Sequence, residues 1–243
     1  MLSDWWQKNI ARLTDPSCCL CRMNIEAEQL TSSHHAFWCT SCGKDLIQLH
    51  RCRRCGLPTQ EKNAEHCGAC LAAPPPWHRL YCLSGYQPPL SDLVTQLKHQ
   101  RQFWHARPLA LELAAVIEKP APIITCVPMH WSRRLWRGFN QSEHLAYFLA
   151  NRLGSEFEPN LLRRNRRTKP QQGLNARQRQ SNLKTAFAIN HLSSHKHVAI
   201  VDDVVTTGAT IEQLCKLLLD VGVETIDIYC VCRTTLNDTN PSV

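Results

Sequence analysis

The stretch that decides the fold is Val198–Thr210, which reads V-A-I-V-D-D-V-V-T-T-G-A-T. Its first four residues, Val198–Val201, form a short continuous run of β-formers, which is typical of a strand buried in a parallel sheet. An acidic pair, Asp202 and Asp203, follows this run. The next residues lead into apolar positions at helical spacing, which are Ile211, Leu214, Leu217 and Leu218. The stretch therefore predicts a strand, an acidic pair, a hydroxyl-rich loop and a helix, in that order.

The predicted loop has the composition of a phosphate site. The start of a helix presents free backbone N–H groups and the positive end of the helix dipole, and both attract an anion. Gly208 allows the backbone to close on the anion, and Thr206, Thr207 and Thr210 add hydroxyl donors. Two carboxylates would repel a phosphate, but they accept hydrogen bonds from the two hydroxyls of a diol. A phosphate beside a cis-diol is a ribose 5-phosphate. The alternative is an acidic pair at a strand end followed by an ordinary turn.

The same stretch resembles the phosphoribosyl pyrophosphate (PRPP) loop of type I phosphoribosyltransferases. This resemblance implies that Asp202 and Asp203 hold the ribose hydroxyls and act as the catalytic pair. It also implies that the loop residues Thr206, Thr207, Gly208, Ala209 and Thr210 hold the 5-phosphate. The chain does not fit a Walker loop, because no G-K-[ST] follows the glycine, and it contains no G-x-G-x-x-G.

The composition is that of a globular protein, and we expect it to be cytoplasmic. The chain has 243 residues, enough for one large or two modest domains, of which 43% are apolar and 20% are charged. No apolar run reaches the 18 residues of a membrane span, and Met1–Trp6 lacks the basic-then-apolar order of a signal peptide. We therefore expect neither a membrane span nor secretion.

The cysteines predict two metal centres. Nine of the 14 cysteines lie between Cys18 and Cys70, and eight of these form C-x-x-C pairs. In a reducing compartment this pattern indicates metal rather than disulfides. We expect two structural Zn²⁺ ions in successive zinc ribbons, with these ligands: Cys18, Cys21, Cys39 and Cys42, then Cys52, Cys55, Cys67 and Cys70. Interleaved pairing of the knuckles is the alternative, and Cys19, His34, His35 and His66 are alternative ligands.

A proline-rich segment, L-A-A-P-P-P-W at residues 71–77, predicts a domain boundary. We expect an N-terminal helix and a double zinc ribbon in residues 1–73, and a second domain in residues 77–243. Strand and helix patterns alternate in the second domain, which predicts an α/β fold with a mostly parallel sheet and helices on both faces. Ligands of such sheets bind beyond the carboxyl ends of the strands, where Pro128 and Asp202 both fall.

Basic residues are gathered in two acid-free stretches, Lys119–Gln141 and residues 159–201. Such clusters suit a polyanion, either pyrophosphate or a nucleic-acid backbone. We expect Arg133 and Arg137 near a pyrophosphate group. In the second stretch, residues 161–183 predict a long functional loop, whose candidate lid or nucleic-acid contacts are Arg164, Arg167, Lys169, Arg177 and Arg179. The aromatic residues Trp131, Trp136 and Phe139 could stack on bases, but packing in the core or at a hinge is the favoured expectation.

Taken together, these motifs resemble the ComF family, also described under the name GntX. The resemblance covers nearly the whole chain and rests on the cysteine knuckles and these motifs: Leu97-Lys98, V-P-M-H at 127–130, R-G-F-N-Q at 137–141, T-K-P-Q-Q-G-L at 168–174, R-Q-S-N at 179–182, and the stretch that contains Asp202 and Asp203. It implies a double zinc ribbon on a type I phosphoribosyltransferase domain, and a role in the uptake or use of external DNA.

The resemblance leaves the reaction open. An active enzyme would transfer the ribose 5-phosphate of Mg²⁺-bound PRPP to an acceptor that no motif identifies. A binding protein would keep the PRPP site for binding or regulation, and its partners would include single-stranded DNA and other components of the DNA-uptake machinery. A PRPP-sensing regulator is the third hypothesis, although no helix-turn-helix is evident.

Overall fold

The computed structural model describes residues 17–25, 37–46, 50–59, 65–165, 186–190 and 195–234. The N-terminal helix predicted in the first 16 residues lies outside this part of the chain. Contacts divide the chain into two compact units, Met1–Ile47 and Gln48–Val243, which are described separately. The second unit includes the second pair of cysteine knuckles as well as the sheet, while the domain boundary at residues 73–77 stays a prediction.

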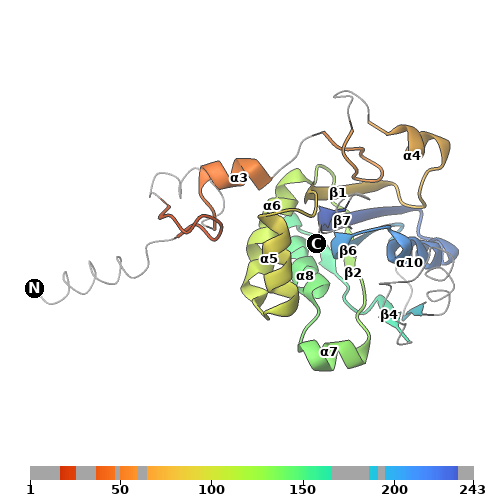
Figure 1. The fold of residues 1–243 in the computed structure, drawn as a ribbon. Helices are drawn as coiled ribbons and strands as arrows, with labels where there is room; N and C mark the ends of the chain where they lie inside the picture. The colour runs from red at the N-terminus through yellow and green to blue at the C-terminus, as the bar shows by residue number, and fades with distance from the viewer. Residues whose placement is uncertain are drawn as a thin grey trace, which may run out of the picture. The chain divides into compact units, whose positions relative to one another are not determined.

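The second unit is built on a parallel sheet, as predicted. Among the described residues, five strands pair in the order β1-β7-β6-β2-β3, and every neighbouring pair is parallel. Figure 1 shows them in the centre of this unit. Their bounds are Arg79–Ser84 for β1, Ile123–Cys126 for β2, Glu156–Phe157 for β3, His197–Val205 for β6 and Thr225–Arg233 for β7.

After the adjacent strands β2 and β6, the chain crosses over to neighbours on opposite sides within the sheet. From β2 it passes through helix α8 (Gln141–Leu153) to β3, and from the neighbouring β6 it passes through α10 (Ala209–Asp220) to β7 on the other side. Right-handed crossovers then place α8 and α10 on opposite faces of the sheet, as Figure 1 shows. The carboxyl ends of β2 and β6 therefore form a topological switch point, where open α/β sheets bind their ligands.

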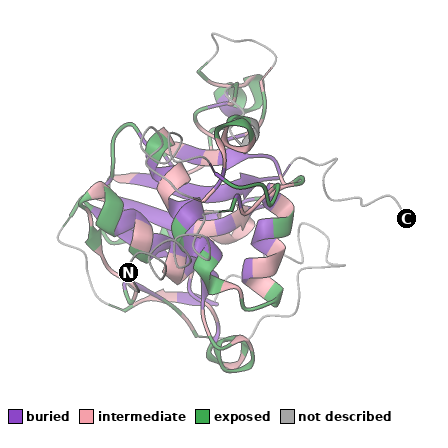
Figure 2. Ribbon diagram, turned by 90° about the vertical axis from the view of Figure 1, so that its left-hand side faces the viewer, coloured by how far each residue is buried: buried purple, intermediate pink, exposed green. Residues whose placement is uncertain are grey.

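Three helices cover the face of the sheet that bears α8: α5 (Leu90–His99), α6 (Ala106–Val116) and α8 itself, with the short helix η1 (Phe103–His105) leading into α6. Each helix turns one apolar stripe inward; in α5 the buried positions are Leu90, Leu93, Val94 and Leu97. The central strands β2, β6 and β7 are mostly buried, and Figure 2 shows purple along the middle of the sheet. The inward stripe therefore fixes which side of α5 faces the sheet.

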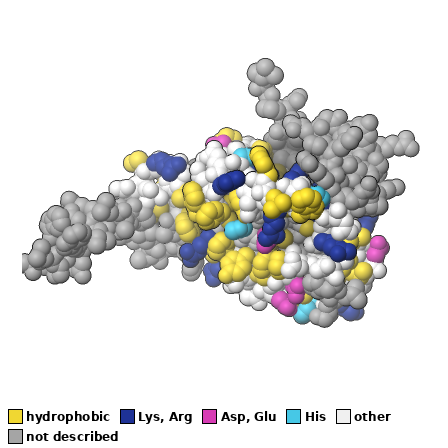
Figure 3. All heavy atoms as spheres, turned by 90° about the horizontal axis from the view of Figure 1, so that it is seen from below, with side chains coloured by type: hydrophobic (Ala, Val, Ile, Leu, Met, Phe, Trp, Pro, Cys, Tyr) yellow, Lys and Arg dark blue, Asp and Glu magenta, His cyan; other side chains and the backbone are white. Residues whose placement is uncertain are grey.

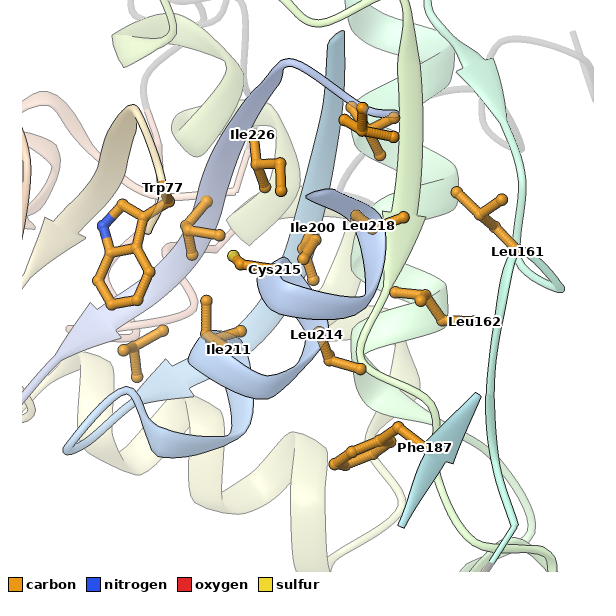
Figure 4. Packing of buried hydrophobic residues seen from close by; sticks show 14 of the residues in the cluster. Trp77, Leu161, Leu162, Phe187, Ile200, Ile211, Leu214, Cys215, Leu218 and Ile226 are labelled. Carbon is orange, nitrogen blue, oxygen red and sulfur yellow. The ribbon is translucent and has the colours of Figure 1, made fainter. Parts of the chain in front are cut away.

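The opposite face holds a hydrophobic cluster to which α10 contributes Ile211, Leu214, Cys215 and Leu218. These side chains pack on Ile200 and Ile226 from the sheet, with Trp77 at one edge (Figure 4). A small antiparallel ribbon closes the other edge. It consists of β4 (Leu162–Arg164) and β5 (Phe187–Ile189), which contribute Leu162 and Phe187.

Two elements differ from the prediction. Strand β6 does not end at Val201 but runs to Val205, so Asp202 and Asp203 lie inside it. The reason is the length of its neighbour, since β7 continues far enough for Val205 to pair with Arg233. The long loop predicted from residue 161 begins with strand β4, because Arg163 pairs with Ala188 of β5.

The cysteine knuckles are tight turns. In the first unit Cys18 N–H donates to the Met23 carbonyl at 2.8 Å, and α3 (Thr40–Leu46) follows Cys39. In the second unit Cys52 N–H donates to the Leu57 carbonyl at 2.8 Å, and α4 (Gly68–Ala72) follows Cys67.

None of the helices in the described ranges is long and apolar enough to cross a membrane.

Candidate functional site

A polar pocket lies at the carboxyl end of β6, at the switch point. Its lining includes Asp202 and every residue from Val204 to Ile211. The predicted phosphate loop, Thr206–Thr210, is thus assembled around one hollow, together with one of the two predicted carboxylates. Thr206 and Thr207 are exposed, whereas Gly208 is buried.

Gly208 gives the loop its shape. It is the N-cap of α10 and has a φ of 81°, in the left-handed region that glycine adopts without strain. The first intrahelical bond runs from Glu212 N–H to the Gly208 carbonyl at 2.8 Å, so the N–H groups of the first turn before it have no intrahelical acceptor. These donors and the threonine hydroxyls form the anion-attracting end of the site.

The acidic pair is held from both sides. Asp202 Oδ1 accepts a hydrogen bond from Ser142 Oγ at 3.0 Å and from Asp203 N–H at 3.0 Å. Asp203 Oδ2 lies 2.8 Å from Nζ of Lys98, and its Oδ1 accepts from Val204 N–H at 2.7 Å. The side chain of Asp203 is only 3% exposed. Helices α8 and α5 therefore each supply one polar side chain that fixes one carboxylate.

The charges of this cluster are coupled. Burial and the neighbouring charge of Asp203 raise the pKa of Asp202 to about 7, although Lys98 and the Ser142 hydrogen bond oppose the rise. Burial by itself would lower the pKa of Lys98, but the attraction of Asp203, and then of Asp202, outweighs it and raises that pKa. Lys98 therefore stays protonated at neutral pH, while Asp202 is poised to gain or lose its proton.

Lys98 and Ser142 are the site residues to which sequence reasoning gave no role. Lys98 entered the sequence analysis only as part of the motif Leu97-Lys98, without a role. Asn140, in the motif R-G-F-N-Q, connects the start of α8 to the residue that follows β2. Its Oδ1 accepts from Ser142 N–H at 3.2 Å, and its Nδ2 donates to the Val127 carbonyl at 3.1 Å. Asn140 thereby caps α8 and ties it to the end of β2.

The predicted pyrophosphate arginines lie on helix α7 (Trp131–Arg137), which follows β2. Arg137 donates to Gln141 Oε1 at 2.8 Å. Its pKa is lowered by burial, while the charge of Asp203 acts in the opposite direction. Arg133 is exposed on the same helix, and Arg164 of β4 lies with its guanidinium 5.2 Å from the centre of the Phe187 ring. The other basic candidates, Arg167, Lys169, Arg177 and Arg179, lie outside the described residues.

Helix α7 also corrects an expectation. Core packing was favoured for its tryptophans, yet the exposed fractions are 65% for Trp131 and 74% for Trp136, and Leu135 is 76% exposed. The helix has no buried residue, because it projects beyond the sheet rather than packing on it. Figure 3 views the molecule from below, the side on which α7 lies in Figure 1, and shows hydrophobic side chains next to Lys and Arg side chains.

The cysteines form two clusters of four, with the sulfur atoms of each cluster within 4.8 Å of one another. The first comprises Cys18, Cys21, Cys39 and Cys42, and the second comprises Cys52, Cys55, Cys67 and Cys70. Each cluster brings together two successive knuckles, as the predicted pairing requires, and neither combines knuckles in the interleaved way. Cys19 and His66 are not members of either cluster, and His34 and His35 lie outside the described residues.

Both clusters have the chemistry of a zinc site. Burial would raise the pKa of the Cys18 and Cys52 thiols, but hydrogen bonds from the backbone outweigh it and lower the pKa to about 6 and about 7, respectively. In the second cluster, Cys67 N–H lies 3.2 Å from the Cys52 sulfur. Four thiols with such N–H support can hold a tetrahedral Zn²⁺ ion.

Comparisons with known proteins agree with this architecture. Residues 140–241, which contain α8, the acidic pair and the phosphate loop, match the family model of the phosphoribosyl transferase domain. The chain is 42% identical to the DNA utilization protein YhgH of Salmonella typhimurium, over 91% of this chain and 99% of that protein. It is 39% identical to YhgH of Escherichia coli K12 over the same shares.

A third relative comes from another genus. Competence protein F of Haemophilus influenzae is 35% identical, over 80% of this chain and 90% of that protein. The chain therefore belongs to the ComF family, together with competence protein F and the DNA utilization protein YhgH, and carries a phosphoribosyl transferase domain after its paired cysteine knuckles.

Proposed function

We propose that this protein binds the ribose 5-phosphate part of PRPP at the β6–α10 loop and serves in the uptake or use of external DNA. The proposal of ribose 5-phosphate binding rests on how the acidic pair and the loop lie together at the switch point. A carboxylate pair fixed by Lys98 and Ser142 lies at the entrance to a loop whose buried glycine has a left-handed conformation. The names and degree of identity of the relatives support the second part.

Each part of the ligand meets groups of matching chemistry. The 5-phosphate would accept hydrogen bonds from the backbone and hydroxyls of residues 206–210. The ribose hydroxyls would donate to Asp202 and Asp203. The pyrophosphate would lie toward α7, where Arg133 is exposed and Arg137 is within the electrostatic reach of Asp203. Mg²⁺ bound to PRPP would offset the pyrophosphate charge, and the lid role of Arg167, Lys169, Arg177 and Arg179 stays a prediction.

Helix α7 favours a second partner, single-stranded DNA. Two exposed tryptophans on one short helix, beside the exposed Arg133 and Arg134, combine base-stacking surface with phosphate-binding charge. Arg134 is partly offset by Glu143 at 2.9 Å, whereas Arg101 donates to the Trp136 carbonyl at 3.1 Å and adds a cation to the same area. We propose a cytoplasmic location, in which this surface meets incoming strands and the rest of the uptake machinery, with Zn²⁺ in both cysteine clusters.

Transfer of the phosphoribosyl group is the alternative role of the same site. The described residues offer positioning and charge for such a reaction, through Asp202 and Asp203, but no element identifies an acceptor. A phosphoribosyltransferase of nucleotide metabolism and a PRPP-responsive DNA-handling protein would therefore share this binding geometry. They differ in whether pyrophosphate is released.

The test is calorimetric titration of the zinc-loaded protein with PRPP and Mg²⁺, followed by a pyrophosphate assay with nucleobases and with DNA. We expect the wild type to bind and Asp203→Asn to bind at least about tenfold more weakly, because a carboxylate that accepts from the diol is lost. Asp220→Asn, at the exposed end of α10, is the matched control and should bind like the wild type. Equal affinity in Asp203→Asn and the wild type would contradict the proposed site. Pyrophosphate release would establish an enzyme.

A further inference from the structure

A single buried arginine joins the second cysteine cluster to the phosphate loop. Arg233 lies at the end of β7 and is only 7% exposed. Its Nε donates to the carbonyl of Cys55 at 2.8 Å. Its Nη1 donates to the carbonyl of Val205 at 3.1 Å and also to that of Thr206. One guanidinium therefore connects a residue of the metal cluster to the last residue of β6 and the first residue of the phosphate loop.

A tryptophan makes a second connection between the same two sites. The indole N–H of Trp77 donates to the carbonyl of Arg54 at 2.6 Å, inside the turn between Cys52 and Cys55. The far edge of its ring lies 3.1 Å from where a Cβ would stand on Gly208, so the ring covers the glycine of the loop. Trp77 is 5% exposed and packs in the cluster with α10, as Figure 4 shows.

The knuckle that carries these contacts is pressed against the sheet. Leu80 N–H of β1 donates to the Arg53 carbonyl at 2.9 Å. Gly56, with a φ of 71°, lies so close that an added Cβ would stand 2.4 Å from Leu80 Cδ2 and 3.4 Å from Cγ of Arg233. The turn at residues 52–56 thus packs directly against β1 and against Arg233.

We propose that Arg233 and Trp77 are positioning residues that link metal binding at the second cysteine cluster to anion binding at the phosphate loop. The link rests on the proposed function, since the anion is the 5-phosphate of the ribose ligand. Zn²⁺ would supply a fixed anchor for the Cys52 and Cys55 thiolates, and so for the carbonyls of Arg54 and Cys55. With those acceptors fixed, Arg233 and Trp77 hold residues 205–208 in the shape that binds phosphate.

Such a link is reciprocal, because two ligands that favour the same arrangement raise each other's affinity by the same factor. Ribose 5-phosphate should therefore tighten the binding of zinc at the second cluster. The first cluster belongs to the other compact unit and provides an internal reference in the same protein.

The decisive experiment uses the wild-type, zinc-loaded protein. Competition with a chelator of known affinity gives the dissociation constant of each zinc ion, with and without saturating ribose 5-phosphate. We expect one of the two constants to fall about fivefold or more, which is the usual range of linked sites, and the other to stay unchanged. Mass spectrometry of the alkylated cysteines identifies which cluster has released its ion.

A variant isolates the connecting side chain. Arg233→Lys keeps the positive charge, but one ammonium group cannot donate in the fixed directions of a guanidinium. We expect this variant to hold two zinc ions, to bind ribose 5-phosphate about fivefold or more weakly, and to show no effect of the sugar phosphate on zinc affinity. Arg152→Lys, exposed near the end of α8, is the matched control.

The outcomes separate the two proposals. If ribose 5-phosphate binds the wild type but changes neither zinc constant, the link is wrong and the proposed site stands. If the fully zinc-loaded wild type does not bind ribose 5-phosphate, both the proposed site and the link are wrong. Because the first measurement needs no substitution, poor folding of a variant would not prevent a decision.

Discussion

Replacing Asp202 by asparagine should make the protein more stable and its proposed site weaker. Asp202 lies beside Asp203, and burial together with that neighbouring charge raises its pKa from 3.8 to about 7. Asparagine has the same shape and no charge. Its Oδ1 can still accept from Ser142 Oγ and from Asp203 N–H, which now donate at 3.0 Å each. The substitution therefore removes the charge and retains both hydrogen bonds.

The size of the effect follows from the shift of about three pKa units. Each unit corresponds to about 1.4 kcal/mol, so ionised Asp202 costs at most about 4 kcal/mol of folding free energy. That shift already includes the opposing attraction of Lys98, and because Asp202 is partly accessible to solvent, which screens its charge, we expect a gain of about 1–3 kcal/mol at pH 8. The native pKa lies above that of the unfolded chain. Ionisation of Asp202 therefore lowers the free energy of unfolding of the wild type as pH rises from about 4 to about 7. The increase in that free energy caused by Asp202→Asn should accordingly be smaller at pH 5.5 than at pH 8.

Urea unfolding of the zinc-loaded wild type and variant at pH 5.5 and pH 8, followed by tryptophan fluorescence, measures this difference. Asp220→Asn, whose side chain is exposed, is the control and should change stability by less than about 0.5 kcal/mol at either pH. The same Asp202→Asn protein should bind ribose 5-phosphate at least about tenfold more weakly. The reasoning about the acidic pair would be refuted by an Asp202→Asn protein that is less stable than the wild type at pH 8. It would also be refuted if the substitution changed the free energy of unfolding by the same amount at both pH values.

Three further predictions concern neighbouring features. Gly208→Ala should weaken ribose 5-phosphate binding in calorimetry by about tenfold or more, while the protein still holds two zinc ions. The reason is that the added Cβ would lie 3.1 Å from the Trp77 ring, on a backbone with a φ of 81°. Wild-type affinity in this variant would contradict the role given to Gly208. Lys98→Met should destabilise the protein by about 3 kcal/mol at pH 8 in urea unfolding, because it leaves the buried charge of Asp203 without its partner, and a loss under about 1 kcal/mol would speak against the pair. Trp136→Ala should weaken single-stranded DNA binding measured by fluorescence anisotropy at low salt by about 1–3 kcal/mol, and undiminished binding would remove α7 from the proposed DNA surface.

Local patterns were enough to predict the parallel sheet, the loop and helix that follow the acidic pair, and the gathering of eight cysteines in two clusters. The β-branched run Val198–Val201 favoured a buried strand, and the apolar spacing after Gly208 and the threonines indicated a helix. The C-x-x-C spacing indicated the eight clustered cysteines, but it left interleaved pairing as an alternative, and only the folded turns show which four lie together.

What sequence reasoning missed depends on contacts between distant residues. Lys98 precedes Asp203 by more than a hundred residues, and only the docking of α5 on the sheet brings them together. Strand β6 continues past Val201 because β7 is long enough to pair with it, which its own residues do not reveal. The exposure of Trp131 and Trp136 was wrongly predicted, because the sequence of a short helix does not reveal whether another element covers it.

The most direct test of the central claim compares ribose 5-phosphate with 2-deoxyribose 5-phosphate in calorimetric titrations of the zinc-loaded wild type. The two sugars share the phosphate but differ by one hydroxyl of the diol that Asp202 and Asp203 are proposed to accept. We predict that the deoxy sugar binds at least about tenfold more weakly, since one buried carboxylate acceptor is left without its donor. Equal affinities would show that the acidic pair does not hold the diol and would contradict the proposed function of the site.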